Sequence, residues 1–255
     1  MDERHFTAAP TFADKLRALD WKKIAIILVA LALVVVLVIV LINVIFGSSK
    51  NDPIKYKEKY ANAKEIDYIK MTSEAFNGVD GGNMAKILKV LAKSEDFKDL
   101  IEEMEEGFKE DYEDNVDEYG KNFKITYKND KEMEEKLDRD ELKRYKAQIK
   151  TAGENILDLV DEFKDMDKDE QKEAAEDIGI TYNDLKEMLK YLEAFGRELK
   201  SATVDDGYEL EVIETITGKE LDEPEEDEID MTVLKVNGKW ICLDLISLSF
   251  LSTLY

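Results

Sequence analysis

Residues 231–243 have the sequence MTVLKVNGKWICL, in which Asn237-Gly238 separates two runs of large apolar and β-branched residues. Such runs favour β-strands. Asn-Gly supplies the two positive φ angles of a type I′ turn, whose twist matches that of paired antiparallel strands. The stretch therefore predicts a β-hairpin, and it is the most specific local structural signal in the polar part of the chain.

Two segments upstream of the hairpin show the period of two that is typical of half-buried strands. The apolar positions are Phe123, Ile125 and Tyr127 in the first segment and Tyr208, Leu210, Val212 and Ile216 in the second. An acidic loop, predicted from Gly218 to Glu228, joins the second segment to the hairpin. Together these segments predict a small antiparallel sheet.

Most of the remaining polar part has apolar residues at spacings of three and four, which predicts amphipathic helices. Asn51, Asp52 and Pro53 form a helix-start signal, and this first helix is expected to reach Phe76. The later stripes are Met84, Ile87, Leu88 and Leu91; Phe97, Leu100, Ile101, Met104, Phe108 and Tyr112; Leu142, Tyr145, Ile149, Ala152, Ile156, Leu159 and Phe163; and Leu185, Met188, Leu189, Leu192, Phe195 and Leu199.

Three positions are expected to set helix boundaries in this region. Gly120 ends the second of these stripes, and Gly179 ends a short helix predicted over residues 169–178. Thr181 with Asp184 resembles a capping box and starts the last helix, with Asp in place of the usual Glu or Gln.

Helices followed by a late antiparallel sheet that contains V-x-G-K-W resemble the cystatin/NTF2-like superfamily. The residues that carry the resemblance lie at 119–127, 207–218 and 231–245. The resemblance implies an α+β fold in which a small curved antiparallel sheet wraps a helix, here with a helical insertion at about 130–203. It also implies a bacterial surface protein with one N-terminal span. Catalytic members use a His/Asp pair inside the sheet, and residues after Phe46 contain no His, so no catalytic residue is carried over.

The residues from Ile24 to Ser49 carry no charge, and Ile24–Phe46 is strongly apolar over 23 residues. A helix of that length measures about 34 Å, which is enough to cross a hydrocarbon core of about 30 Å. Cleaved signal peptides have shorter apolar regions and a small-x-small cleavage site, which this run lacks. The run therefore predicts an uncleaved transmembrane helix.

The orientation of this span depends on the basic residues beside it. Five basic residues precede the span and five follow it within a similar distance, so the totals do not discriminate. Lys22 and Lys23 directly adjoin the span, whereas only Lys50 is close on the other side. The positive-inside rule therefore favours a cytoplasmic N-terminus and an extracytoplasmic C-terminal domain.

The chain is strongly acidic, with a formal net charge of −23. Residues 47–255 carry 31 basic and 55 acidic residues, so nucleic acid and anionic lipid are poor partners for this part. The acidity either serves solubility or favours cations and basic partners. Cys242 is the only Cys, so an intramolecular disulfide is excluded, which suits a Gram-positive surface.

The residue types available after the span exclude several kinds of catalysis. The only His, His5, precedes the span, so the polar part has neither a Ser-His-Asp nor a Cys-His arrangement and no His-based zinc site. No phosphate-binding glycine motif occurs. Cys242 alternates with Trp240 and is interpreted as a small core residue. A pair of catalytic carboxylates is not excluded by residue type, but pairs arise by chance in so acidic a chain.

A calcium loop is the sharpest metal hypothesis. Asp165, Asp167, Asp169 and Glu176 occupy positions 1, 3, 5 and 12 of a twelve-residue loop, where oxygen ligands converge on a cation. Glu170 stands at position 6, where the loop needs Gly, and a Lys stands at position 8. The alternative is a solvated turn in which Asp169 caps the following helix. The sequence therefore predicts no metal ligand among these residues.

These observations predict four segments: a cytoplasmic segment (1–23), a transmembrane helix (24–46), a juxtamembrane linker with a stalk helix (47–82) and an α+β extracytoplasmic domain (83–255). The predicted function is a membrane-anchored, non-catalytic binding or interaction domain without a cofactor. Its expected partners are the membrane and a protein at the cell surface, and not nucleic acid. The alternatives are an envelope enzyme or lipid-handling domain with a cone-shaped apolar pocket, and a structural spacer.

Overall fold

Seven helices and six strands make up the part of the chain that the computed structural model describes, which is residues 46–47, 49–76 and 82–242. The helices are α3 (Asp52–Ala61), α4 (Tyr68–Phe76), α5 (Asn83–Leu91), α6 (Glu95–Tyr119), α7 (Arg139–Asp165), α8 (Lys168–Asp177) and α9 (Tyr182–Lys200). The strands are β1 (Phe46–Gly47), β2 (Lys124–Asn129), β3 (Glu135–Lys136), β4 (Val204–Thr217), β5 (Glu225–Val236) and β6 (Lys239–Cys242). These elements confirm the predicted α+β class.

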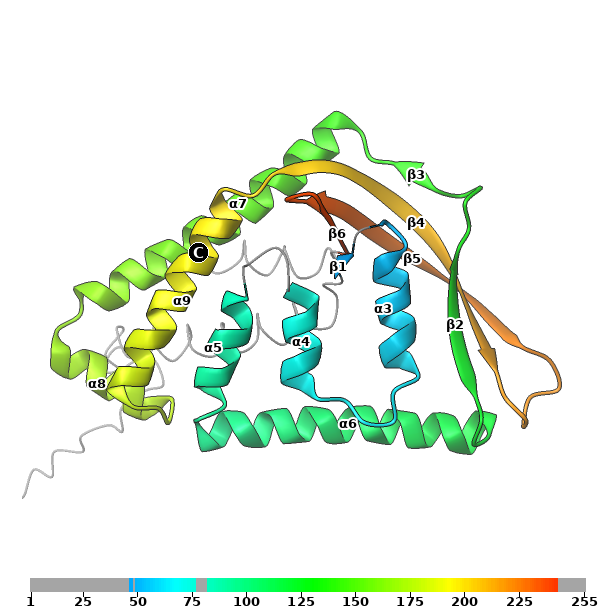
Figure 1. Cartoon of the computed structure of the whole chain (residues 1–255), viewed down its shortest axis with the longest axis horizontal. Helices are drawn as coiled ribbons and strands as arrows, with labels where there is room; N and C mark the ends of the chain where they lie inside the picture. Colours follow the sequence, from blue (N-terminus) through cyan, green and yellow to red (C-terminus); the bar gives the residue numbers. More distant parts are fainter. Residues whose placement is uncertain (1–45, 48, 77–81, 243–255) are drawn as a thin grey trace, which may run out of the picture.

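All the described strands belong to one antiparallel sheet. Its order is β1-β6-β5-β4-β2, and β3 pairs with β4 beside β2. The two long strands β4 and β5 pair from Ile216 and Glu225 at one end to Val204 and Val236 at the other. They bend into an arch over α3 and α4, with α6 running below (Figure 1). The curved antiparallel sheet is therefore confirmed.

The hairpin predicted from Asn237-Gly238 joins β5 to β6. Asn237 has φ 50° and Gly238 has φ 79°, the two positive angles that a type I′ turn requires. The Asn237 side chain accepts the backbone N–H of Thr203 at 2.9 Å, and the Asn237 N–H bonds the Thr203 carbonyl at 3.0 Å. The turn is therefore also fixed to the start of β4.

The concave face of the sheet packs on α3, which stands inside the arch (Figure 1). Ile54 of α3 is buried in a cluster of sheet residues that consists of Leu210, Val212, Met231, Val233, Trp240 and Cys242. The burial of Cys242 agrees with its interpretation as a core residue. A neighbouring cluster, formed by Tyr119, Phe123, Ile125 and Ile216, continues this core toward the end of α6.

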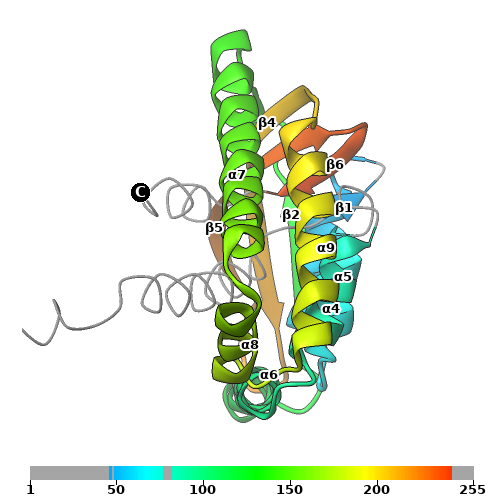
Figure 2. The same cartoon turned by 90° about the vertical axis from the view of Figure 1, so that its left-hand side faces the viewer.

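The largest core lies where the helices meet the other side of β5 and β6. Leu234, Val236 and Ile241 belong to it, together with residues of α4, α5, α7 and α9. Helices α7 and α9 run side by side along this part of the molecule (Figure 2). Their contact is close because Gly153 and Gly196 face each other, and an added Cβ on Gly153 would lie 2.6 Å from the Gly196 carbonyl oxygen.

The single helix predicted over residues 53–76 is wrong, because α3 ends at Ala61 and α4 begins at Tyr68. Ile66 and Tyr68 turn into the core, where 6% and 1% of their surface is exposed. The Tyr68 N–H bonds the Glu105 carboxylate of α6 at 2.8 Å, so a neighbouring helix supplies the hydrogen bond at the start of α4. Helix α3 packs against β1, β2 and β6, and α4 packs against β1, α5 and α6.

The other helix boundaries follow the sequence more closely. Gly120 and Gly179 follow the ends of α6 and α8 with positive φ angles. Thr181 and Asp184 form the predicted capping box of α9. The acidic loop predicted over 218–228 is too long, because β5 already begins at Glu225 and pairs with Ile216.

The predicted span Ile24–Phe46 lies outside the described residues, except for Phe46. The apolar tail from Leu245 also lies outside them. Phe46 is not helical: it lies in β1 and pairs with Ile241 of β6. Within residues 46–47, 49–76 and 82–242, no helix combines the length and the apolar character that a membrane span requires.

Candidate functional site

A pocket of about 720 Å³ opens between α3 and the turn that joins α6 to β2. Its lining consists of Lys55, Glu58 and Lys59 from α3 with Asn62 directly after it, and of Lys121, Asn122, Phe123 and Lys124 from the turn and the start of β2. The first four of these residues follow the spacing i, i+3, i+4, i+7, which places them on one face of the helix. Two segments about 60 residues apart in the chain therefore form one site.

Asn62 joins the two walls of the pocket. Its side-chain amide donates to the Ile125 carbonyl at 2.7 Å, and its Oδ1 accepts the Ile125 N–H at 2.9 Å. The amide also donates to the Glu58 carbonyl at 2.7 Å, in the last turn of α3. Since β2 is an edge strand, Asn62 occupies the place of a neighbouring strand and covers a backbone edge that would otherwise be open.

The turn between α6 and β2 is held in a defined shape. Gly120 has φ 94°, and its carbonyl accepts the N–H of Phe123 at 2.9 Å. The Phe123 ring packs against Tyr112 and Tyr119 of α6, with centroid distances of 5.1 Å and 6.4 Å. The positions of Lys121 and Lys124 on either side of Phe123 are therefore fixed by a buried aromatic anchor.

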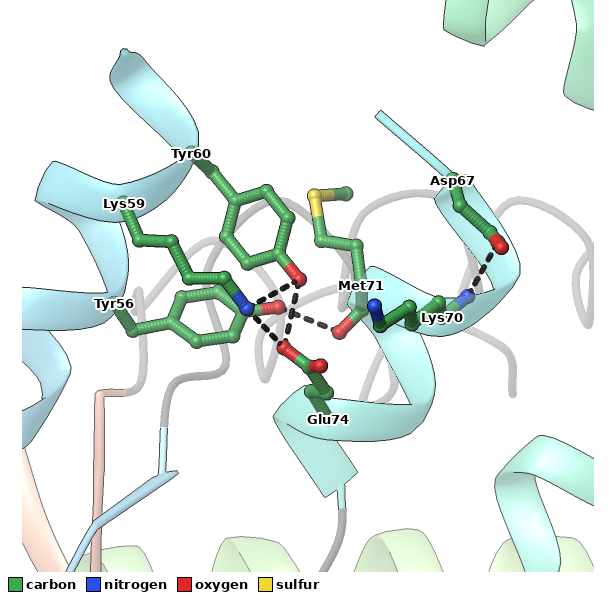
Figure 3. A network of polar contacts seen from close by, with 7 residues as sticks. All are labelled: Tyr56, Lys59, Tyr60, Asp67, Lys70, Met71 and Glu74. Carbon is green, nitrogen blue, oxygen red and sulfur yellow. Dashed lines mark hydrogen bonds and ion pairs between the residues drawn. The ribbon is translucent and has the colours of Figure 1, made fainter. Parts of the chain in front are cut away.

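A polar network joins α3 to α4 (Figure 3), and its Lys59 also lines the pocket. Lys59 pairs with Glu74 at 2.6 Å, and the Tyr60 hydroxyl donates to the same carboxylate at 2.8 Å. The Tyr56 hydroxyl donates to the Met71 carbonyl at 2.5 Å. These bonds tie the two helices together across the break between them.

The same contacts shift the titration of this network. The hydrogen bond from Lys59 holds the pKa of Glu74 below its usual value, and the hydrogen bond to Glu74 raises the pKa of Lys59. Burial raises the pKa of Tyr56 and of Tyr60. Near neutral pH the network therefore contains a charged Lys-Glu pair and two neutral hydroxyls.

The lysines of the pocket differ in how far they are neutralised. Lys59 is held by Glu74, and Lys55 lies 3.6 Å from Asp52 with 75% of its side chain exposed. Within the described part of the chain, neither Lys121 nor Lys124 forms an ion pair. The turn side of the pocket therefore presents ammonium groups that have no carboxylate partner there.

The calcium hypothesis is wrong in its geometry. Asp165 is the last residue of α7, and Asp167 caps α8, where it accepts the N–H groups of Asp169 and Glu170 at 2.8 Å and 2.9 Å. Asp169 pairs with Lys172 at 2.8 Å instead of capping the helix. Because α8 extends the chain to Asp177, Glu176 is held away from the other three carboxylates, and the described residues contain no metal-binding group of His, Cys, Asp or Glu.

Sequence reasoning did not find the pocket. The pocket has two local signals in the sequence. Lys121 and Lys124 stand on either side of Phe123, and Lys55 and Lys59 lie one helical turn apart. Such pairs are frequent in a chain with 36 basic residues. The fold brings the two pairs together through Asn62, which the sequence does not mark.

Comparison with known proteins gives no match for this chain, whether with protein families, curated proteins or solved structures.

Proposed function

We propose that this protein is a membrane-anchored, non-catalytic binding module that holds its ligand in the pocket between α3 and the α6–β2 turn. The observation that carries the proposal is the pocket itself, whose volume of about 720 Å³ falls in the range of small-molecule sites. The anchor is the apolar run Ile24–Phe46. A cytoplasmic N-terminus and an extracytoplasmic pocket follow from Lys22 and Lys23 beside that run.

The composition of the lining supports binding over chemistry. The pocket offers lysines, one glutamate, two asparagines and a phenylalanine, and it contains no His, Cys or Ser. Lysine and carboxylate side chains bind ions and polar groups without further activation. Because Phe123 is the only apolar side chain in the lining, a polar ligand fits this site better than a lipid tail.

The likeness that we propose to the cystatin/NTF2-like fold agrees with a binding function. In the cystatin/NTF2-like arrangement a curved sheet wraps a helix, and here β2, β4 and β5 arch over α3 (Figure 1). We propose that α7, α8 and α9 are the helical insertion, and none of the pocket's lining residues comes from these helices.

The proposal is tested by small-molecule retention on the full-length chain in a neutral detergent. The purified protein is incubated with a low-molecular-weight cell extract and washed, and retained compounds are identified by mass spectrometry. We expect a compound retained by the native chain and lost from Asn122→Trp, whose indole would occupy the pocket. Glu110→Trp, on the exposed side of α6, is the matched control.

Each other outcome has a defined meaning. If no retained compound depends on Asn122, the binding module is refuted and a structural spacer becomes the better account. If the compound is retained and also chemically converted, the non-catalytic part of the proposal is wrong.

A further inference from the structure

The pocket has a charge opposite to that of the molecule. The chain carries a net charge of −23, with 59 acidic and 36 basic residues. Of the eight residues that line the pocket, four are lysines and one is acidic. The site is therefore a locally basic hollow in an acidic protein, and its charge is the feature that a ligand would recognise.

Ordinary structural roles account for part of this charge but not for all of it. Both α3 and α6 end beside the pocket, and basic side chains stabilise the negative end of a helix dipole. Lys59 lies in the last turn of α3 and is paired with Glu74. Lys121 and Lys124 follow the end of α6, and within the described residues no carboxylate pairs with either one. Two ammonium groups thus remain for a ligand, with Lys55 exposed on the facing wall.

The acidic background restricts the size of that ligand. A long polyanion such as nucleic acid, or the surface of an anionic bilayer, would meet repulsion from the rest of the molecule wherever it left the pocket. A small anion would stay within the pocket, where four lysines outnumber the single carboxylate of Glu58. Asn122 is exposed at the rim, with a side-chain amide that can donate to a phosphate or carboxylate oxygen.

We propose that the pocket binds a small molecule that carries two or more phosphate or carboxylate groups, through Lys121 and Lys124 on the turn and Lys55 on α3. This inference rests on the proposed binding function and adds the chemical class of the ligand. At least two negative charges are expected because Lys121 and Lys124, which form no ion pair within the described residues, can each make a charge-assisted contact with the ligand.

The test measures binding of two probes to the full-length chain in neutral detergent at constant ionic strength. Inorganic pyrophosphate represents the phosphate class and citrate the carboxylate class, and the polyamine spermidine is the control of opposite charge. We expect saturable calorimetric binding of at least one anion, weakened by added salt, and binding of pyrophosphate alone or of citrate alone identifies the class.

A matched pair of double variants assigns that binding to the pocket. Lys121→Gln with Lys124→Gln should weaken binding about tenfold or more, because two charge-assisted contacts are lost. Lys146→Gln with Lys190→Gln removes the same charge from exposed positions on α7 and α9 and should leave binding unchanged. Lys121→Gln alone, in an exposed turn, replaces the double variant if the latter does not fold.

Four results would overturn the inference. Equal weakening by the two double variants would show that only the overall charge matters, and preference for spermidine would show that the acidic surface dominates. If neither anion binds while the retention experiment finds another compound that depends on Asn122, the ligand class is wrong and the binding function stands. If both experiments find nothing, both proposals fall together.

Discussion

Asn62 shows how one side chain can complete both a helix end and a sheet edge. Its amide bonds the backbone of Ile125 in β2 and of Glu58 in α3 with three hydrogen bonds of 2.7 to 2.9 Å. A second α3 residue, Glu58, accepts the N–H of Tyr127 at 3.4 Å, on the same edge of β2. Side chains of α3 therefore satisfy the polar groups that an edge strand leaves open.

This role predicts a large effect for a small substitution. Asn62→Ala should lower the free energy of unfolding by about 1–3 kcal/mol, because the N–H and C=O of Ile125 lose their partners in a partly buried place. Urea unfolding followed by circular dichroism measures the change. Asn183→Ala, at an exposed position in the first turn of α9, should cost less than about 0.5 kcal/mol. Equal costs at both sites would contradict the role given to Asn62.

The pair formed by Lys59 and Glu74 predicts a dependence of stability on pH. The pKa of Glu74 is lowered in the folded chain from its usual 4.5 by the hydrogen bond from Lys59. Its contribution is therefore present above about pH 4.5 and is lost as the pH falls through the lower folded value. Since 36% of the Glu74 side chain is exposed, solvent screening limits the contribution to about 0.2–1 kcal/mol.

We therefore expect the native chain to lose more unfolding free energy than Glu74→Gln between about pH 6 and about pH 3. Urea unfolding at a series of pH values measures this difference. Glu110→Gln removes an exposed carboxylate of α6 and should follow the native profile. A Glu74→Gln profile parallel to the native one would show that the pair contributes nothing.

At the scale of elements, the contact between α7 and α9 depends on glycine. A Cβ added to Gly153 would lie 2.4 Å from the backbone nitrogen of Lys200, closer than non-bonded atoms approach. Gly153→Ala should therefore push the helices apart and cost about 1–3 kcal/mol of stability. Thermal unfolding followed by circular dichroism measures the shift.

Gly107 provides the matched control for this prediction. It lies in the interior of α6, and nothing stands within 4 Å of an added Cβ. Gly107→Ala should raise stability by up to about 1 kcal/mol, since alanine is the better helix former. A loss of stability at both positions would mean that the glycines act through backbone flexibility and not through the close contact.

The boundaries of elements could be predicted wherever local chemistry determines them. Asn237-Gly238 forms its turn by backbone preference, and Thr181 with Asp184 caps α9 through neighbouring atoms. The break between α3 and α4 contains neither Gly nor Pro, and its local signals are only Asn62 after α3 and Asp67, whose carboxylate accepts the Lys70 N–H at 2.8 Å. It exists because Tyr68 enters the core and Glu105, from another helix, bonds its N–H.

Local chemistry also explains why the calcium hypothesis looked attractive in the sequence. Alternating carboxylates serve equally as cation ligands and as caps, and one of them, Asp167, forms the capping box of α8 with Glu170. We expect Asp167→Ala to lower stability by about 1 kcal/mol, equally with and without millimolar Ca²⁺. Thermal unfolding measures both values, and a stabilisation by Ca²⁺ that Asp167→Ala abolishes would restore the metal site.

At the scale of the molecule, the Asn62 wall of the pocket lies at the end of α3 that is remote from Phe46, the last residue of the proposed anchor. Phe46, at the end of the apolar run, pairs with β6, and α3 contacts β1. Asn62 follows the other end of α3, about 15 Å along a ten-residue helix. We therefore propose that the pocket faces away from the bilayer, where a soluble ligand would reach it. The sequence predicted an anchor and a domain, but only the fold shows on which side of the domain the lysines meet.

This arrangement gives a direct test of topology by cysteine labelling. Cys242 is 7% exposed and should react slowly, so a single new cysteine can be read against a low background. In intact Gram-positive cells, Glu110→Cys should react with a membrane-impermeant maleimide, because α6 would lie outside. His5→Cys should react only after lysis, because the orientation proposed from Lys22 and Lys23 places the N-terminus in the cytoplasm. The reverse pattern would place the pocket in the cytoplasm, and protein recovered without the membrane fraction would refute the anchor.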